Sequence, residues 1–342
     1  MICIYRISIV TTLVSMMSIN TISPRITAIQ SHSLDRAISK NDFNQIYIFG
    51  DSLSDPGNLF SITQGEIPAH PTYPQQRFSN GLVWSEYFTS KFGLYPKPFA
   101  HDGLAEDGIN FAVGGATTGK TNINGTAFPS LQQQLDAFIA PLQQTHQRAN
   151  PEALYILWAG ANDYLGGNIT NPAIPITNLS EAIQALYEVG ARYILVFNLP
   201  ELGDTPLARN SETINPGQLN QLSDAHNTLL NTTIEQLRQS LAEIHLGLID
   251  IRALFKMVIA SPGQFDLRNV TDSCLIVACS QSDQYLFWDQ LHPTTAAHQI
   301  IAETVFSTLQ LSSQSRVESM TSSDTANKLT MLEAFLLHQR RA

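Results

Sequence analysis

The chain has 342 residues, of which 43% are hydrophobic, and its formal net charge is −10. This length and apolar content are sufficient for a sizeable core, divided into one large domain or two smaller ones. Its Lys and Arg residues form no cluster before the last few positions. An acidic chain without a basic stripe is a poor fit to nucleic acid, so we expect no nucleic-acid partner.

The first 28 residues differ in character from the rest. They contain two arginines and no acidic residue, and Ile7–Ile22 is largely apolar. This stretch is shorter and more polar than a comfortable membrane span. A basic residue, an apolar core and small residues in this order are typical of a secretory signal. We predict a signal peptide over 1–28, a linker over 29–44 and a secreted or periplasmic protein, with an uncleaved anchor as the alternative.

Apolar runs then alternate with amphipathic segments. The predicted strands are Gln45–Phe49, Gly108–Val113, Ala153–Ala159, Tyr193–Leu199 and His245–Ile251. The predicted helices are Leu82–Phe92, Pro129–Arg148, Leu179–Gly190, Gln218–Ile244 and Thr294–Leu311. Continuous apolar runs such as LYILWA are typical of strands covered on both faces. The alternation predicts one α/β domain over 45–311 with a parallel sheet. The polar tail over 312–342 is expected to hold at most a short helix.

Polar or Gly-rich segments follow the predicted strands. In parallel sheets of this kind, ligands bind beyond the carboxyl ends of the strands. The segments there are GDSLSDPGN, GGATTGKT, GANDY and NLPELGDTP, and DQLHPT precedes the last helix. Several such segments at one edge of the sheet indicate a functional site.

Residues 114–121, GGATTGKT, match the phosphate-binding pattern G-x-x-x-x-G-K-[ST]. That motif requires a helix directly after it, since the helix N-terminus helps to hold the phosphates. The residues that follow include two asparagines, a glycine and Pro129, which make a poor helix start. We interpret the segment as a Gly/Thr-rich turn, and a nucleotide-binding protein using Lys120 is the less favoured alternative.

Acyl transfer by a serine is the second chemistry that these segments support. A serine hydroxyl needs a base, usually a histidine that a carboxylate orients. Ser52 lies in GDSLS, and Asp289 and His292 lie three residues apart in DQLHP. The Ser52 and Gly115 N–H groups and the Asn162 amide are suitable donors to an oxyanion. Taken singly, each of these residues is explained as well by a turn, and the common G-x-S-x-G elbow is absent.

Taken together and in order, six blocks resemble the GDSL family, also called SGNH hydrolases: FGDSLSDPGN, RFSNGLVW, NFAVGGATT, GANDY, NLPELGDTP and DQLHPT. They run from Phe49 to Thr294. The resemblance implies a flavodoxin-like three-layer α/β/α sandwich with a central parallel sheet. One departure is Pro56, where relatives often carry threonine; we expect it to alter only the loop.

The resemblance also implies roles for individual residues. It makes Ser52 the nucleophile, His292 its base and Asp289 the partner of that base. It makes Ser52, Gly115 and Asn162 the donors of the oxyanion hole. No cofactor or metal is implied.

The function implied is serine-dependent hydrolysis of carboxylic esters, either lipids or small acyl esters. We expect an ester or lipid substrate, contact with lipid surfaces and a monomeric chain. An acyltransferase that uses the same triad and an alcohol acceptor is the nearest alternative. A non-catalytic binding protein on the same scaffold is disfavoured, because all five catalytic-type residues are present.

Three further expectations concern single residues. Cys274 and Cys279 form either a short-loop disulfide or two half-buried thiols. Asp55 and Asn58 hold the GDSL loop by hydrogen bonds to backbone. Seven aromatic residues near the motifs either line an acyl pocket or belong to the core: Phe60, Tyr73, Phe78, Trp84, Tyr164, Phe265 and Trp288.

Overall fold

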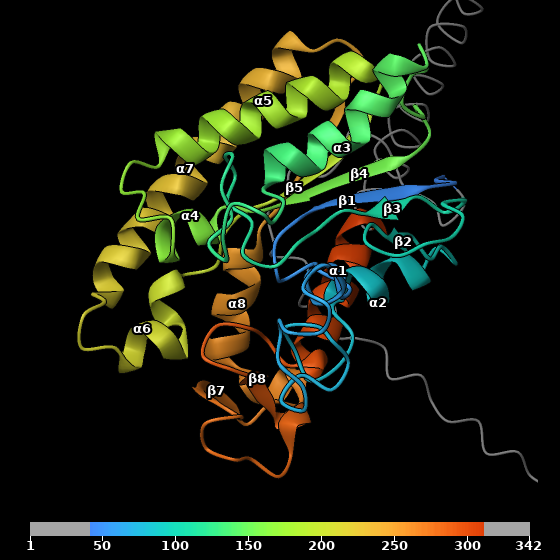
Figure 1. Cartoon of the computed structure of the whole chain (residues 1–342). Helices are drawn as coiled ribbons and strands as arrows, with labels where there is room; N and C mark the ends of the chain where they lie inside the picture. The colour runs from blue at the N-terminus through green and yellow to red at the C-terminus, as the bar shows by residue number, and fades with distance from the viewer. Residues whose placement is uncertain (1–41, 311–342) are drawn as a thin grey trace, which may run out of the picture.

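The computed structural model describes residues 42–310. Three predicted segments lie outside these residues: the signal peptide over 1–28, the part of the linker over 29–44 that precedes residue 42, and the tail over 312–342. Among the described residues, a six-stranded sheet is covered by helices on both faces, and a two-stranded sheet lies apart from it (Figure 1).

All six strands of the main sheet are parallel. They are β1 (Ile46–Gly50), β2 (Lys97–Pro98), β3 (Ile109–Asn110), β4 (Leu154–Trp158), β5 (Tyr193–Phe197) and β6 (His245–Ile249). Their order in the sheet is β2-β3-β1-β4-β5-β6. Without the two-residue edge strand β2, this is the flavodoxin-like order. The predicted fold class is therefore confirmed.

Two layers of helices cover the sheet (Figure 1). One layer holds α3 (Leu131–Gln144), α5 (Ala173–Val189) and α7 (Pro216–Ser240). The other holds α2 (Trp84–Ser90), α8 (Ile251–Ala260) and the helical residues 295–310. Within residues 42–310, no helix is both long enough and apolar enough to cross a bilayer.

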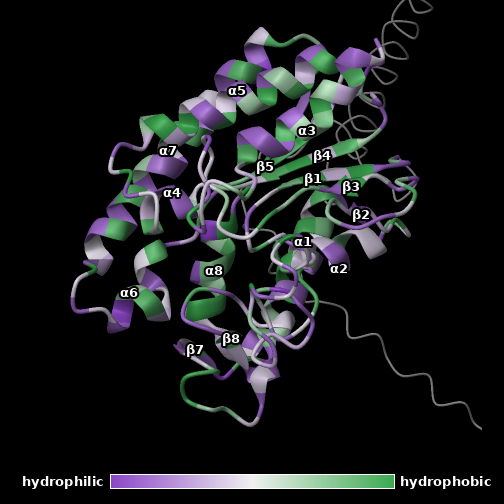
Figure 2. Ribbon diagram, in the orientation of Figure 1, coloured by the Kyte–Doolittle hydropathy of each residue, from purple (hydrophilic) through white to green (hydrophobic). Residues whose placement is uncertain are grey.

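Alternating side chains of the strands feed two separate cores. In β1, Ile46 and Ile48 pack in the layer of α2 and α8, whereas Tyr47 and Phe49 pack in the layer of α3, α5 and α7. This is the period of two that the pleat of a strand imposes. Because both faces are buried, the central strands β1, β4 and β5 are largely apolar, as Figure 2 shows.

The short elements escaped prediction. They include α1 (Asn58–Ile62), α4 (Ala161–Leu165), α6 (Pro206–Asn210), and a sheet of β7 (Asn269–Ser273) and β8 (Tyr285–Phe287). Helices of five residues leave no amphipathic period to detect. The predicted strand Gly108–Val113 is also longer than the observed β3, and α5 begins at Ala173 rather than Leu179.

Helix α8 was missed because only Asp250 separates its first apolar residue, Ile251, from the apolar residues of β6. The side chain of Asp250 ends the strand and starts the helix, since it accepts the N–H of Ala253 at 2.9 Å. The predicted strand therefore stops at Ile249 instead of Ile251.

Cys274 and Cys279 form a disulfide between β7 and β8. The backbone N–H groups of Cys274 and Leu275 donate to the carbonyl oxygens of Phe287 and Trp288 at 3.0 and 2.9 Å. The disulfide loop is thereby fastened to the segment that leads into DQLHP.

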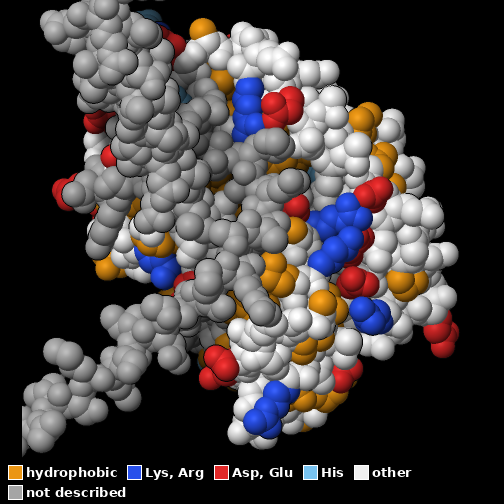
Figure 3. All heavy atoms as spheres, turned by 180° about the vertical axis from the view of Figure 1, so that it is seen from behind, with side chains coloured by type: hydrophobic (Ala, Val, Ile, Leu, Met, Phe, Trp, Pro, Cys, Tyr) orange, Lys and Arg blue, Asp and Glu red, His pale blue; other side chains and the backbone are white. Residues whose placement is uncertain are grey.

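The outer surface carries charges of both signs. On the face seen in Figure 3, Lys and Arg side chains of the described residues lie beside Asp and Glu side chains.

The end of β1 is held by a side chain from α3. Gln134 accepts the Gly50 N–H at 2.9 Å and donates to the Gly50 carbonyl at 2.8 Å. The side chain is buried, so it satisfies backbone groups that water does not reach. It fixes the peptide two residues before Ser52.

We predict that Gln134→Leu lowers the free energy of unfolding by about 1–3 kcal/mol, because the buried Gly50 N–H loses its acceptor. Urea titration of the two proteins measures this difference. Gln143→Leu, at an exposed position of the same helix, is the matched control and should stay within about 0.5 kcal/mol of the wild type. Equal effects of the two substitutions would contradict the assignment.

Candidate active site

The predicted site residues lie at the carboxyl edge of the sheet, where strand order reverses on either side of β1. Ser52 follows β1 and Asn162 lies in α4, directly after β4. A sheet of this order binds its ligands at such a switch point. Gly50 permits the sharp exit from β1, because a Cβ there would overlap the carbonyl oxygen of Trp158.

Ser52, His292 and Asp289 form one chain of hydrogen bonds. Ser52 Oγ lies 2.9 Å from His292 Nε2, and His292 Nδ1 lies 2.7 Å from Asp289 Oδ2. The two polar contacts use both ring nitrogens, so the imidazole is oriented from both sides. The structure thus brings together three residues that are up to 240 positions apart in the chain.

Asp289 is fixed by the turn in which it lies. Its Oδ1 accepts the backbone N–H groups of Leu291 and His292 at 2.8 and 2.7 Å. Burial by itself raises the pKa of this carboxyl, but the charge and hydrogen bonds of His292 and these N–H groups outweigh it and lower the pKa to about 2. The carboxylate therefore stays ionised at neutral pH.

The pKa of His292 is raised above its ordinary value of 6.5. Burial opposes this shift, whereas the carboxylates of Asp289 and, more weakly, Asp51 favour the charged imidazolium. Asp51 is itself buried, and burial raises the pKa of its carboxyl to about 7.

The three predicted oxyanion donors each have a hydrogen that no protein group in residues 42–310 accepts. Asn162 donates one amide hydrogen to the carbonyl of Ala116 at 3.1 Å, which leaves its second hydrogen available. Within residues 42–310, the N–H groups of Ser52 and Gly115 have no protein acceptor. Ser52 and Asn162 line the same pocket, and Gly115 lies next to the residue that Asn162 holds.

Glycine is required at the start of α4. Gly160 has a φ of 129°, a region that side chains rarely adopt, and a Cβ there would lie 2.8 Å from the ring of His226. This turn sets the direction in which α4 presents Asn162.

Carboxylates hold the loop that contains Gly115. Asp55 accepts the Gly114 N–H at 2.8 Å, as well as three N–H groups of its own loop. Burial raises the pKa of Asp55 to about 6, and these donors act in the opposite direction. The predicted structural role of Asp55 is confirmed. Asn58 also holds backbone, through the carbonyls of Asn110 and Ala112 at 2.9 and 2.8 Å.

The same contacts argue against phosphate binding by residues 114–121. A phosphate loop needs free N–H groups and a helix after it. Here the N–H groups of Gly114, Thr117 and Thr118 donate to protein acceptors, and the next helix, α3, begins ten residues after the loop at Leu131. Asp163 accepts both the N–H and the hydroxyl of Thr118. The segment is a turn held by hydrogen bonds, as we interpreted it from the sequence.

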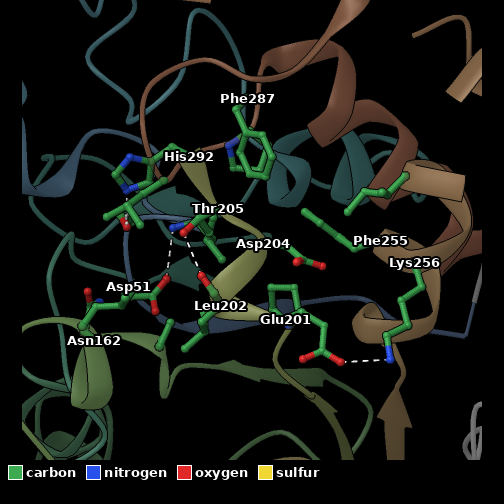
Figure 4. A pocket seen from close by; sticks show the side chains of 18 residues that line it. Asp51, Asn162, Glu201, Leu202, Asp204, Thr205, Phe255, Lys256, Phe287 and His292 are labelled. Atoms are coloured by element: carbon green, nitrogen blue, oxygen red, sulfur yellow. Dashed lines mark hydrogen bonds and ion pairs between the residues drawn. The ribbon is translucent and has the colours of Figure 1, made fainter. Parts of the chain in front are cut away.

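A pocket adjoins Ser52 and His292 (Figure 4). None of the seven aromatic residues considered from the sequence lines it; Phe255 and Phe287 do. Of the seven, Trp84 and Tyr164 are buried in the core, and Phe78 lies over the His292 ring with centroids 5.0 Å apart. Within residues 42–310, no three His, Cys, Asp or Glu side chains are grouped as a metal site.

Tyr73 was considered only as a pocket or core aromatic; its contact with Asp289 was missed, because nothing in its sequence position links it to DQLHP. Its hydroxyl donates to Asp289 Oδ2 at 2.7 Å, the oxygen that also faces His292 Nδ1. Burial, followed by the Asp289 charge, raises the pKa of the Tyr73 hydroxyl, so it remains a donor. Tyr73 and Asp289 are 216 positions apart, and only the folded chain shows their contact.

The sheet order and the hydrogen-bonded Ser52, His292 and Asp289 at its edge define an α/β protein with a candidate serine-nucleophile site. Residues 46–305 match the family described as GDSL-like Lipase/Acylhydrolase. The match spans well over half of the chain, and the protein belongs to this family.

The chain is similar to several named proteins. A phosphatidylcholine-sterol acyltransferase from Aeromonas hydrophila is 29% identical, over 79% of this chain and 91% of its own. A GDSL esterase/lipase from Arabidopsis thaliana is 28% identical, over 75% of this chain and 87% of its own. The solved lipase/acylhydrolase from Enterococcus faecalis is 15% identical, over 78% of this chain and 96% of its own, with a TM-score of 0.41.

Proposed function

We propose that Ser52, His292 and Asp289 act as a catalytic triad that hydrolyses carboxylic esters. His292 Nε2 takes the hydroxyl proton as Ser52 Oγ attacks the carbonyl carbon. The tetrahedral intermediate collapses, and the alcohol leaves with the proton from His292. Water, deprotonated by His292, then attacks the acyl-serine and releases the acid and Ser52. Asp289 keeps the imidazole oriented and stabilises its charged form.

The oxyanion of each tetrahedral intermediate is assigned to three donors: the N–H groups of Ser52 and Gly115 and the side chain of Asn162. Each such donor contributes about 3 kcal/mol to the transition state. The tied backbone on both sides of Gly115 supports this role, because preorganised donors need no reorientation during the reaction.

One observation carries the proposal. The hydroxyl, imidazole and carboxylate are joined at 2.9 and 2.7 Å, and Ser52 and His292 line a pocket. A nucleophile, its base and the group that orients the base need this geometry.

Acyl transfer to an alcohol is the second candidate, because a relative that matches most of this chain is named an acyltransferase. The acyl-serine is common to both reactions, and only the second nucleophile differs. Product analysis with a lipid ester and an added sterol separates them: free fatty acid indicates hydrolysis, and sterol ester indicates transfer.

We also propose that the enzyme acts outside the cytoplasm. The Cys274–Cys279 disulfide supports this location, since disulfides persist in oxidising compartments. The apolar leader over 1–28 is consistent with export. Contact with lipid surfaces and a monomeric state stay predictions.

We predict that Ser52→Ala lowers kcat on p-nitrophenyl acetate at least about a thousandfold, because the nucleophile is removed. Release of p-nitrophenol measures the rate. Ser90→Ala, at an exposed serine of α2, is the control and should keep wild-type activity. Retention of activity in Ser52→Ala would rule out the mechanism.

We predict that kcat/KM rises with pH through a midpoint above about 6.5, because His292 must be neutral to act as base and its pKa is raised. Asp51→Asn should move this midpoint to lower pH, since it removes a negative charge that favours the imidazolium. Asp283→Asn, at an exposed position, should leave it in place. A flat profile between pH 5 and 8 would exclude His292 as the base.

A further inference from the structure

The pocket beside Ser52 extends toward α8. In Figure 4, His292 and Asn162 lie at one side of it, and Phe255 and Lys256 of α8 lie at the opposite side. Between them the wall is mostly apolar. Its principal apolar side chains are Leu165, Leu202, Phe255, Ile259, Phe287 and Leu291.

The charges in the wall disfavour an anionic ligand. Three carboxyl groups, Asp51, Glu201 and Asp204, line the pocket, and Lys256 is the one Lys or Arg among the lining residues. Lys256 Nζ lies 2.9 Å from Glu201 Oε1, an atom that Arg252 Nε also approaches at 2.7 Å. The ammonium is therefore already paired, and the wall offers a phosphate no unpaired Lys or Arg side chain.

Few polar groups in the wall are free to bind a sugar. The Thr205 hydroxyl donates to the Leu202 carbonyl at 2.7 Å and accepts the Ala208 N–H at 3.4 Å. Glu201 Oε1 is occupied by two cations, and its Oε2 is buried out of reach of solvent. A carbohydrate would lose its bonds to water here without replacing them.

We propose that this pocket binds an unbranched aliphatic chain of the ester substrate, in preference to a phosphate head group or a sugar. This inference rests on the proposed function, because the pocket begins at the nucleophile. The chain belongs to the acyl half or to the alcohol half of the ester. The chemistry of the wall is the same for both, and the experiment separates them.

The test is a chain-length series in two arms. One arm uses p-nitrophenyl acetate, butyrate, hexanoate and octanoate; the other uses ethyl, butyl, hexyl and octyl acetate. In the arm whose chain enters the pocket, kcat/KM should rise about fourfold per methylene, the factor that corresponds to burial of one CH₂. The other arm should stay flat. Activity that is flat in both arms would overturn the inference.

Ile259→Trp fills part of the pocket and should reduce the slope of the responsive arm by at least half. Leu229→Trp, at a half-exposed position of α7 outside the pocket, is the matched control and should keep the wild-type slope. The same slope in both variants would overturn the inference. If Ser52→Ala abolishes acetate hydrolysis and kcat/KM is flat in both arms, the proposed function stands and this inference fails.

A separate contact carries a second inference. The hydroxyl of Tyr73 and the imidazole of His292 meet the same carboxylate oxygen of Asp289, both at 2.7 Å. Tyr73 comes from the loop between α1 and α2. Arg77 fastens this loop to Glu86 of α2 through two hydrogen bonds. Phe78 of the same loop covers the His292 ring.

We infer that Tyr73 is a positioning residue for the acid–base pair. The Tyr73 hydrogen bond fixes the Asp289 carboxylate against rotation and disperses part of the negative charge of that carboxylate. Loss of that bond leaves more charge on the oxygen that faces His292, and this favours the imidazolium.

Tyr73→Phe should lower kcat about tenfold or more, the effect of losing one hydrogen bond to a charged group, with KM little changed. It should also move the acidic limb of the pH profile to higher pH. Tyr87→Phe, which removes a 2.9 Å contact with Thr295 Oγ1, is the control for a structural effect alone and should not move that limb. An unchanged kcat or an unmoved limb in Tyr73→Phe would overturn the inference.

Discussion

The contact between Ser52 and His292 is the constraint on which this site depends. It joins the first strand of the sheet to the segment before the last described helix. Neither residue has a function in acyl chemistry without the other, because a serine hydroxyl is a weak nucleophile until a base takes its proton. The parallel sheet places Ser52 at its carboxyl edge, and the segment after β8 of the smaller sheet brings His292 to it.

Buried polar side chains then make that edge rigid. Gln134 holds the last peptide of β1, Asp55 holds Gly114, and Asp163 holds Thr118. Each takes up backbone groups that would otherwise be buried without partners. The cost of leaving such groups unpaired ties the loops to one conformation, and this conformation sets the geometry of the donors near Ser52.

The apolar pocket and the polar edge have different roles in the proposed site. The edge carries the proposed nucleophile, base and donors, whereas the wall toward α8 supplies apolar surface. Apolar burial is non-directional and selects a ligand by its shape and hydrophobicity, while hydrogen bonds fix the reacting atoms. The two parts can therefore differ independently among enzymes that share the same fold.

The sequence by itself predicted the parallel sheet and its five main strands. It also predicted Ser52, Asp289 and His292 as candidate site residues. Strands buried on both faces are apolar throughout, and ordered motifs mark the loops between them. Only the tertiary structure decided the short elements, the pocket wall and the contact of Tyr73 with Asp289. A five-residue helix has no detectable period. A contact between residues 216 positions apart leaves no local pattern, because the fold alone sets the distance between them.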